Sequence, residues 1–277
     1  MTTKNETQPV QAIEQAFAKG RAAFMPYFTL GYPDFETSLD VIEACARAGA
    51  DLMELGLPFS DPLADGPTIQ HSTQVALDQG MTMAKCIQAV KELRDRGVTT
   101  PFMMMGYYNP ALAYGVDRFV GDAAEAGANG FIIPDLPPEE AEMFREQVDA
   151  HGMGMSFLLA PNSTPARVQA VTKASRGFTY LVSVTGITGA RTQLPTDLQG
   201  FLARVRKQAE HPLAVGFGIS SPEQAAAVGN AADGVIVGSA LISTVRDAHQ
   251  RGENAAAAAG TFVKSLAMAL ASPPPPN

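Results

Sequence analysis

The chain of 277 residues is 46% hydrophobic and 17% charged, enough apolar material for a large core, which excludes disordered and fibrous proteins. Its formal net charge is −8, and no cluster of lysine or arginine offsets it, so a surface for nucleic acid or anionic membrane is not expected. The N-terminus lacks a signal-peptide core, and no run reaches the roughly 18 apolar residues that cross a membrane. We therefore expect a cytoplasmic protein without membrane contact.

Short apolar runs, each suited to a buried parallel strand, alternate with amphipathic segments along the chain. The predicted strands span residues 24–28, 52–55, 102–105, 130–133, 155–159, 180–182, 213–215 and 234–237. Helical segments lie between them, for example over residues 38–47, 84–96, 139–150 and 222–228. Several runs follow an Ala-rich helix end and a small-residue turn, which is typical of a helix that leads into a parallel strand.

This alternation without a linker predicts a single α/β domain over residues 1–272, built as one (β/α)8 TIM barrel. A doubly wound parallel sheet is the alternative. Residues 6–19 are predicted to form an extra N-terminal helix across the bottom of the barrel. The proline-rich residues 273–277 are predicted to be a short disordered tail.

Two carboxylates follow the second predicted strand, at the end of a barrel where catalytic residues lie. Glu54 lies inside an apolar run, where burial would raise its pKa and suit it to acid–base catalysis; a structural acid is the alternative. Asp65 follows in a stiff loop of proline and glycine, which could return a second carboxylate to the barrel mouth. A turn or a helix cap would explain Asp65 equally well, and the same holds for Asp61.

Glycine-containing turns follow the last two predicted strands, at residues 216–218 and 238–240. Backbone N–H groups beside a helix start bind anions, and the seventh and eighth loops of a barrel commonly hold phosphate. Ser220 or Ser221 could cap the next helix, but capping does not explain glycines after both strands. Residues 185–191 predict either a loop that closes over the phosphate or an ordinary flexible loop.

Several signals of other chemistry are missing from the sequence. No lysine ends a predicted strand, so a Schiff-base aldolase is not expected. The 2 cysteines and 4 histidines lack the spacing of a disulfide framework or of metal ligands. No GxGxxG or P-loop pattern supports nucleotide binding. The residues alone therefore predict cofactor-free acid–base chemistry on a small phosphorylated substrate.

A long motif at residues 53–67, MELGLPFSDPLADGP, closely resembles the signature of the tryptophan synthase α subunit family. The resemblance runs from residue 24 to about residue 242 and keeps the order of the family's motifs. These include YFTLGYP at 27–33, YYNP at 107–110, PDLP at 134–137, YLVS at 180–183, TGITG at 185–189 and GFGIS at 216–220.

The resemblance implies a lyase that cleaves indole-3-glycerol phosphate to indole and glyceraldehyde 3-phosphate by a retro-aldol reaction, without a cofactor. Glu54 matches the family's acid–base residue, Asp65 the residue that holds the indole N–H, and Tyr180 a tyrosine that assists proton transfer. The implied indole pocket consists of Tyr27, Met105, Tyr107, Ile132 and Thr188. The implied phosphate ligands are Gly189, Gly218, Gly238 and Ser239.

The resemblance also implies a partner, because the family works as an α2β2 complex that passes indole to a β subunit containing pyridoxal phosphate. The residues that match the family's β-facing loops are Pro58, Asp61, Pro62, Asn109, Asp135 and Pro137, although each proline alone could simply form a turn. The enzymatic rivals are indole-3-glycerol-phosphate synthase, whose catalytic lysine is missing here, and a histidine-pathway isomerase. A non-catalytic barrel that regulates a β subunit is the rival of another class, and the intact Glu54 and Asp65 argue against it.

Overall fold

The computed structural model describes residues 8–182, 198–216 and 218–271, and within these ranges nine strands form one sheet. The strands are β1 (Ala23–Thr29), β2 (Met53–Gly56), β3 (Phe102–Met105), β4 (Gly130–Ile132), β5 (Gly154–Ser156), β6 (Leu158–Leu159), β7 (Thr179–Val182), β8 (Leu213–Gly216) and β9 (Gly234–Val237). Neighbouring strands pair in parallel in the order β5-β4-β3-β2-β1-β9-β8-β7-β6. The first and last strands of this order, β5 and β6, are separated along the chain only by Phe157, so the sheet curls into a barrel.

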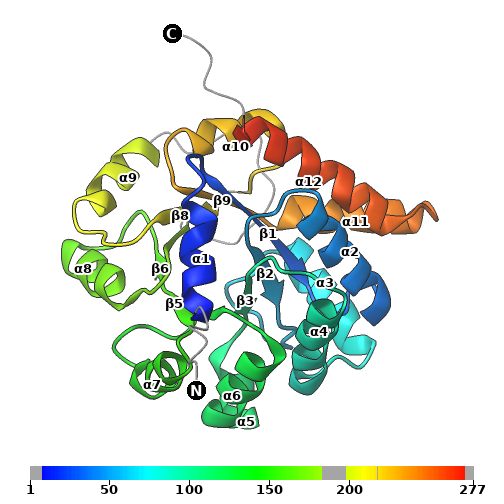
Figure 1. Ribbon diagram of the computed structural model, residues 1–277, viewed down its shortest axis with the longest axis horizontal. Helices are drawn as coiled ribbons and strands as arrows, with labels where there is room; N and C mark the ends of the chain where they lie inside the picture. The colour runs from blue at the N-terminus through cyan, green and yellow to red at the C-terminus, as the bar shows by residue number, and fades with distance from the viewer. Residues whose placement is uncertain (1–7, 183–197, 217, 272–277) are drawn as a thin grey trace, which may run out of the picture.

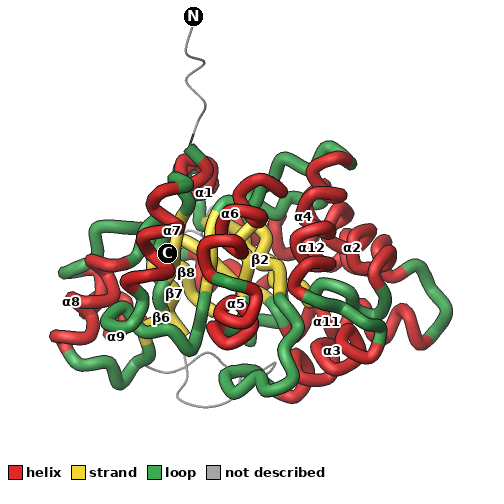
Figure 2. The backbone as a smooth tube through the Cα atoms, turned by 90° about the horizontal axis from the view of Figure 1, so that it is seen from below, coloured by secondary structure: helices red, strands yellow, loops and turns green. Residues whose placement is uncertain are grey.

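Helices surround the strands on the outside, except for the first helix, which lies across one end of the barrel, as Figures 1 and 2 show. They are α1 (Pro9–Phe17), α2 (Phe35–Arg47), α3 (Pro67–Asp78), α4 (Met83–Asp95), α5 (Tyr108–Tyr114), α6 (Val116–Ala126), α7 (Glu142–Ala150), α8 (Pro165–Ala174), α9 (Leu198–Arg206), α10 (Pro222–Gly229), α11 (Ser239–Gln250) and α12 (Ala255–Ala271). This arrangement confirms the predicted (β/α)8 TIM barrel and rules out the doubly wound sheet. The predicted tail at residues 273–277 lies outside the described residues.

The fifth predicted strand, at residues 155–159, is present in two pieces. The backbone N–H of Phe157 donates to the hydroxyl of Ser175, at 3.3 Å, instead of to a neighbouring strand. The carbonyl of Phe157 still accepts from the backbone N–H of Tyr180 in β7, at 3.1 Å. The interruption therefore leaves the barrel closed on this side.

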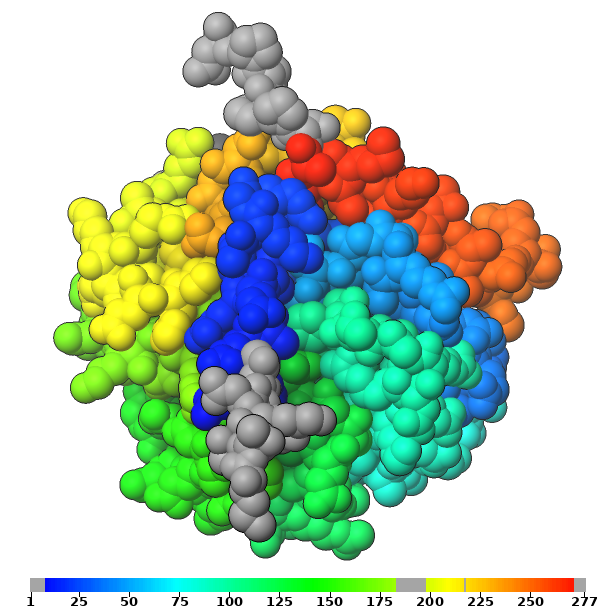
Figure 3. Space-filling model, viewed as in Figure 1, coloured from blue at the N-terminus to red at the C-terminus, as the bar shows by residue number. Residues whose placement is uncertain are grey.

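Two apolar layers hold the barrel together, one inside the strands and one between the strands and the outer helices. Helix α1 closes the inner layer at one end, where it lies across the face of the molecule in Figure 3. Its Ile13 is fully buried, and the ring of Phe17 lies 5.5 Å from that of Phe178 at the start of β7. The predicted helix across the barrel bottom is thus confirmed, over Pro9–Phe17, and the other end of the barrel remains for a site.

Candidate active site

Glu54 points into the barrel from the middle of β2. It is in register with Tyr27 of β1 and with Met103 of β3, a member of the inner apolar layer. Its side chain is fully buried, and neither carboxylate oxygen has a hydrogen-bond partner among the described residues. Burial without a compensating donor disfavours the charged form, so the pKa of Glu54 is raised well above its usual value. Glu54 therefore favours its protonated, neutral form more strongly than an exposed glutamate does.

Asp65 lies in the loop between β2 and α3 and remains partly accessible to solvent. The hydroxyl of Tyr107, which follows β3, donates to Oδ2 of Asp65 at 3.0 Å. Burial raises the pKa of Asp65 to about 6, and the hydrogen bond from Tyr107 opposes this rise. With a pKa of about 6, most Asp65 side chains are ionised at pH 7, whereas burial favours the neutral form of Glu54.

Two buried tyrosines, Tyr27 of β1 and Tyr180 of β7, lie close enough to both acids to interact with them electrostatically. Burial is the largest cause of the raised pKa of each phenol, and both site carboxyl groups raise it further by their charge. Each hydroxyl lies over a glycine of the next strand. A Cβ on Gly56 would overlap the hydroxyl of Tyr27, and one on Gly216 would lie 2.7 Å from that of Tyr180. The phenols therefore fit because these strands end in glycine.

The predicted indole pocket is apolar on the side of β3 and β4. Ile132 is fully buried in the inner layer, and Met105, its partner in register, packs against that layer. The Tyr107 ring is also buried, with 5% of its surface exposed. The structure thus places these three at the ends of adjacent strands, next to Glu54 and the tyrosines. Thr188 and Gly189, predicted in the loop after β7, lie outside the described residues.

The predicted phosphate residues lie after β8 and β9. Gly218 has φ of 61°, a left-handed conformation that favours glycine. Gly238 directly precedes α11, and the largely buried Ser239 is the first residue of that helix. Ser221, not Ser220, caps α10 by accepting a hydrogen bond from the backbone N–H of Gln224 at 3.3 Å. The start of α11 can supply N–H donors to an anion.

The predicted β-facing residues lie on three loops at the same end of the strands. They are Pro58, Asp61 and Pro62 after β2, Asn109 in the first turn of α5, and Asp135 and Pro137 after β4. Asp61, Asn109 and Asp135 are exposed. Leu63 of the first loop, which the sequence did not single out, is 90% exposed.

The described residues offer no sign of metal chemistry or of a membrane segment. No group of three or more His, Cys, Asp or Glu side chains within them could hold a metal ion. None of the helices in the described ranges is long and apolar enough to cross a membrane. Cys45 and Cys86 are both free and buried.

The sequence and the barrel are similar to those of known proteins. A family model described as tryptophan synthase alpha chain matches residues 13–271. The chain belongs to this family.

The tryptophan synthase alpha chain of Chloroflexus aurantiacus is 48% identical over 256 residues, which cover 92% of this chain and 96% of that one. The structure of tryptophan synthase subunit alpha from Legionella pneumophila is similar at a TM-score of 0.88 and 34% identity, covering 96% of this chain and 99% of that one. A tryptophan synthase of Saccharomyces cerevisiae is 44% identical over 239 residues, which cover 86% of this chain but 34% of that longer protein.

Tryptophan synthase alpha subunits cleave indole-3-glycerol phosphate, and the chain is a carbon–carbon lyase of this family. Family membership confirms the resemblance found in the motif at residues 53–67 and excludes the two rival enzyme families. Sequence reasoning missed three features of the site: the space that Gly56 leaves for Tyr27, the exposure of Leu63 and the hydrogen bond from Tyr107 to Asp65. The glycine two residues after Glu54, at the end of the same strand, was the available signal for the first.

Proposed function

We propose that Glu54 performs the proton transfers by which this chain cleaves indole-3-glycerol phosphate, and that Asp65 stabilises the charge that develops on the indole. The observation that carries the proposal is the buried carboxyl group of Glu54, which has no partner among the described residues. A buried polar group without a partner is costly in free energy, and such groups are commonly retained for function. Its raised pKa keeps the proton that the reaction needs.

The proposed reaction returns Glu54 to its starting state. Neutral Glu54 donates its proton to C3 of the indole, which makes the ring an indoleninium cation. The glycerol hydroxyl next to the ring then gives its proton to the Glu54 carboxylate, and the C–C bond breaks with its electron pair restoring the aromatic ring. Indole and the aldehyde of glyceraldehyde 3-phosphate leave. Tyr180, near both acids, assists these transfers.

Asp65 has a different role because it is ionised. A carboxylate that accepts the indole N–H stabilises the positive charge of the indoleninium, which is strongest in the transition state. Tyr27, Met105, Tyr107 and Ile132 form the walls for the ring, joined by Thr188 from the loop after β7.

The phosphate of the substrate binds between the loops after β8 and β9. Backbone N–H groups of Gly218, Gly238 and Ser239, with Gly189 from the loop after β7, donate to its oxygens. The N-terminus of α11 adds a favourable dipole, since the helix has 12 residues and begins at Ser239. No cofactor is required by this chemistry.

The proposed partner is a tryptophan synthase β subunit, which holds pyridoxal phosphate and receives indole through a channel in an α2β2 complex. Three exposed loops around the barrel mouth and the exposed Leu63 support such a docking face. The yeast relative also supports it, because that protein named tryptophan synthase extends well beyond the region that matches this chain. Docking on these loops would order the site and raise turnover.

Indole release from indole-3-glycerol phosphate, measured with and without a β subunit, tests the proposal. We expect slow release by the chain alone and faster release with the partner. Asp65→Asn should lower kcat by at least about tenfold, which corresponds to roughly 1.4 kcal/mol of barrier. Unchanged turnover in Asp65→Asn would remove Asp65 from the mechanism, and equal rates with and without the partner would contradict activation by β.

A further inference from the structure

Tyr107 contacts the loop that carries Asp65 in three ways. This loop, residues 57–66, connects the end of β2 to α3. The ring of Phe59 lies 5.4 Å from that of Tyr107. The Tyr107 hydroxyl accepts from the backbone N–H of Ala64 at 2.9 Å and donates to Oδ2 of Asp65 at 3.0 Å. One buried hydroxyl thus binds the backbone of the loop and its carboxylate together.

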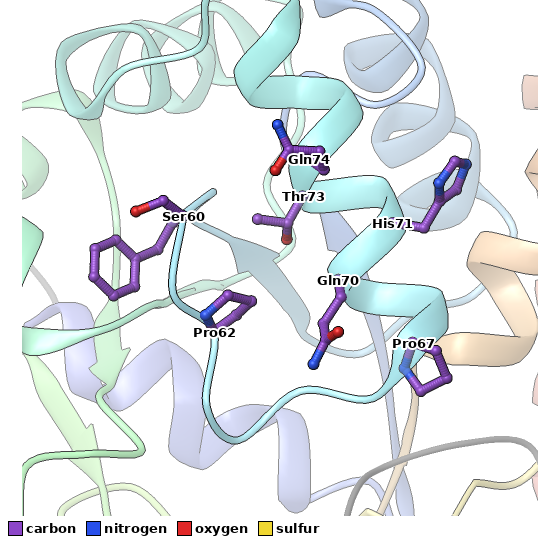
Figure 4. A pocket seen from close by; sticks show the side chains of 8 residues that line it. Ser60, Pro62, Pro67, Gln70, His71, Thr73 and Gln74 are labelled. Carbon is purple, nitrogen blue, oxygen red and sulfur yellow. The ribbon is translucent and has the colours of Figure 1, made fainter.

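The opposite side of the 57–66 loop is not packed against α3. A pocket of about 340 Å3 lies between them (Figure 4). Its lining includes Ser60 and Pro62 on the loop side and Gln70 on the α3 side. Gln70 crosses to the carbonyl of Asp65 at 2.8 Å, which fixes the backbone there but not the carboxylate. Among the described residues, the carboxylate of Asp65 is held by the hydroxyl of Tyr107, which follows β3.

The backbone on both sides of Tyr107 is held by residues of β4 and of the loop after it, and not by the 57–66 loop. The preceding Gly106 donates to the carbonyl of Ile132 in β4 at 3.1 Å. The following Tyr108 donates its N–H to Oδ1 of Asp135 at 2.9 Å, at the start of α5. Since the backbone is held on both sides, the phenol provides a fixed point for the more exposed loop.

We propose that Tyr107 is a positioning residue, whose hydroxyl holds Asp65 in the orientation in which the carboxylate meets the indole N–H. This inference rests on the proposed function and deepens it, because the sequence assigned Tyr107 only to the wall of the pocket. The bond to Oδ2 leaves Oδ1 for the substrate, since no partner of Oδ1 is found among the described residues. A fixed geometry lowers the reorganisation needed in the transition state.

The titration of Asp65 gives a readout that a wall residue would not change. The groups that face Asp65 are Tyr107 after β3, Tyr27 from β1 and Tyr180 from β7, with Glu54 from β2 near the same tyrosines. Burial raises the pKa of each of these other groups, and it raises that of Asp65 to about 6, which lies within the range that a titration can follow. Loss of the Tyr107 hydrogen bond removes a contribution that lowers the pKa of Asp65, which should therefore rise.

The experiment compares Tyr107→Phe with Tyr114→Phe in the full chain. Tyr114 is a matched control, since its hydroxyl donates to Oδ2 of Asp122 at 2.7 Å, away from the site. Carbon-13 NMR of aspartate-labelled protein without substrate reports the pKa of Asp65, whose signal is identified by its loss in Asp65→Asn. We expect a higher pKa in Tyr107→Phe and no change in Tyr114→Phe. An unchanged Asp65 titration in Tyr107→Phe would overturn the proposal.

A double-mutant cycle tests the link to catalysis. We expect Tyr107→Phe to lower kcat/KM by about tenfold in the wild-type background and to have little further effect in Asp65→Asn. Equal losses in both backgrounds would mean that Tyr107 does not act through Asp65, which would overturn the proposal. If the wild type cleaves no indole-3-glycerol phosphate, the proposed function fails, while the substrate-free titration still decides the role of Tyr107.

The wild-type protein supplies a measurement if Tyr107→Phe does not fold. The Cζ resonance of Tyr107 should shift with pH at the same midpoint as the Asp65 carboxyl signal, since the two groups share a hydrogen bond. A Tyr107 resonance that does not follow the Asp65 titration would contradict the proposal.

Discussion

At the scale of single residues, the two carboxyl groups of the candidate site lie in different surroundings. Glu54 has neither solvent nor a donor among the described residues, whereas Asp65 accepts from Tyr107 and is partly exposed. The position of Glu54 in an apolar run was enough to predict that its carboxyl group is buried and that its pKa is raised. Asp65 could not be distinguished from Asp61 by the residues alone, because the contact to Tyr107 joins residues 42 apart. Only the resemblance separated the two.

Glu54→Gln should change how stability depends on pH. The pKa of Glu54 is raised in the folded state, so above its usual value of 4.5 the unfolded chain releases the proton while the folded protein keeps it. The wild type should therefore lose up to about 1.4 kcal/mol of unfolding free energy per pH unit through this residue as pH rises. Glutamine has no proton to release, so the variant should gain relative stability from pH about 5 to about 7. Urea denaturation across this range measures the gain, and parallel pH profiles would contradict it.

At the scale of elements, α1 closes the end of the barrel opposite the candidate site, and close packing determines where it lies. A Cβ on Gly154 would come within 2.6 Å of Ile13 Cδ1, and one on Gly177 would lie 3.0 Å from Ile13 Cγ2. The two glycines therefore allow the helix to approach the strand ends. The sequence predicted this helix, but its contacts depend on residues far along the chain.

Ile13→Ala should lower the unfolding free energy by about 2–5 kcal/mol, because it leaves a cavity beside the inner layer. Glu14→Ala, at an exposed position on the same helix, should change it by less than about 0.5 kcal/mol. Urea denaturation of both variants at one pH gives the comparison. A loss in Ile13→Ala no larger than that in Glu14→Ala would show that α1 is not part of the cooperative core.

Element boundaries show the limits of sequence patterns. All eight predicted runs are strands, but the fifth is divided because Ser175, distant in sequence, accepts the N–H of Phe157. Helix α2 begins at Phe35, ahead of the predicted residue 38, because Asp34 caps it by accepting from the N–H of Thr37 at 2.9 Å. Apolar spacing finds the buried face of a helix, and the first exposed turn lies outside that pattern.

At the scale of the whole molecule, a net charge of −8 coexists with a proposed phosphate site because backbone N–H groups carry no formal charge. Net charge therefore limits the class of partner but does not locate a site. The outer apolar layer runs from Ala22 to Leu270 around the barrel. From this continuity we infer that the described part of the chain forms one domain.

Leu63→Ser should weaken binding of the β subunit at least about tenfold, because docking would remove the apolar surface of this exposed leucine from water. Met268→Ser is the matched control, since Met268 on α12 is 62% exposed and lies outside the three loops. Titration of each variant with the β subunit, followed by the rise in indole release, measures the effect. Equal half-saturation in Leu63→Ser and the wild type would place the docking face elsewhere.

The role of Glu54 as the proton-transferring acid is tested most directly by indole release from the Glu54→Gln variant, with binding of indole-3-glycerol phosphate measured in parallel by calorimetry. Glutamine keeps the shape of the buried acid but cannot donate its proton. We predict binding within a few-fold of the wild type and a rate of indole release lowered by about a hundredfold or more. Release within tenfold of the wild-type rate, at saturating substrate, would contradict the account.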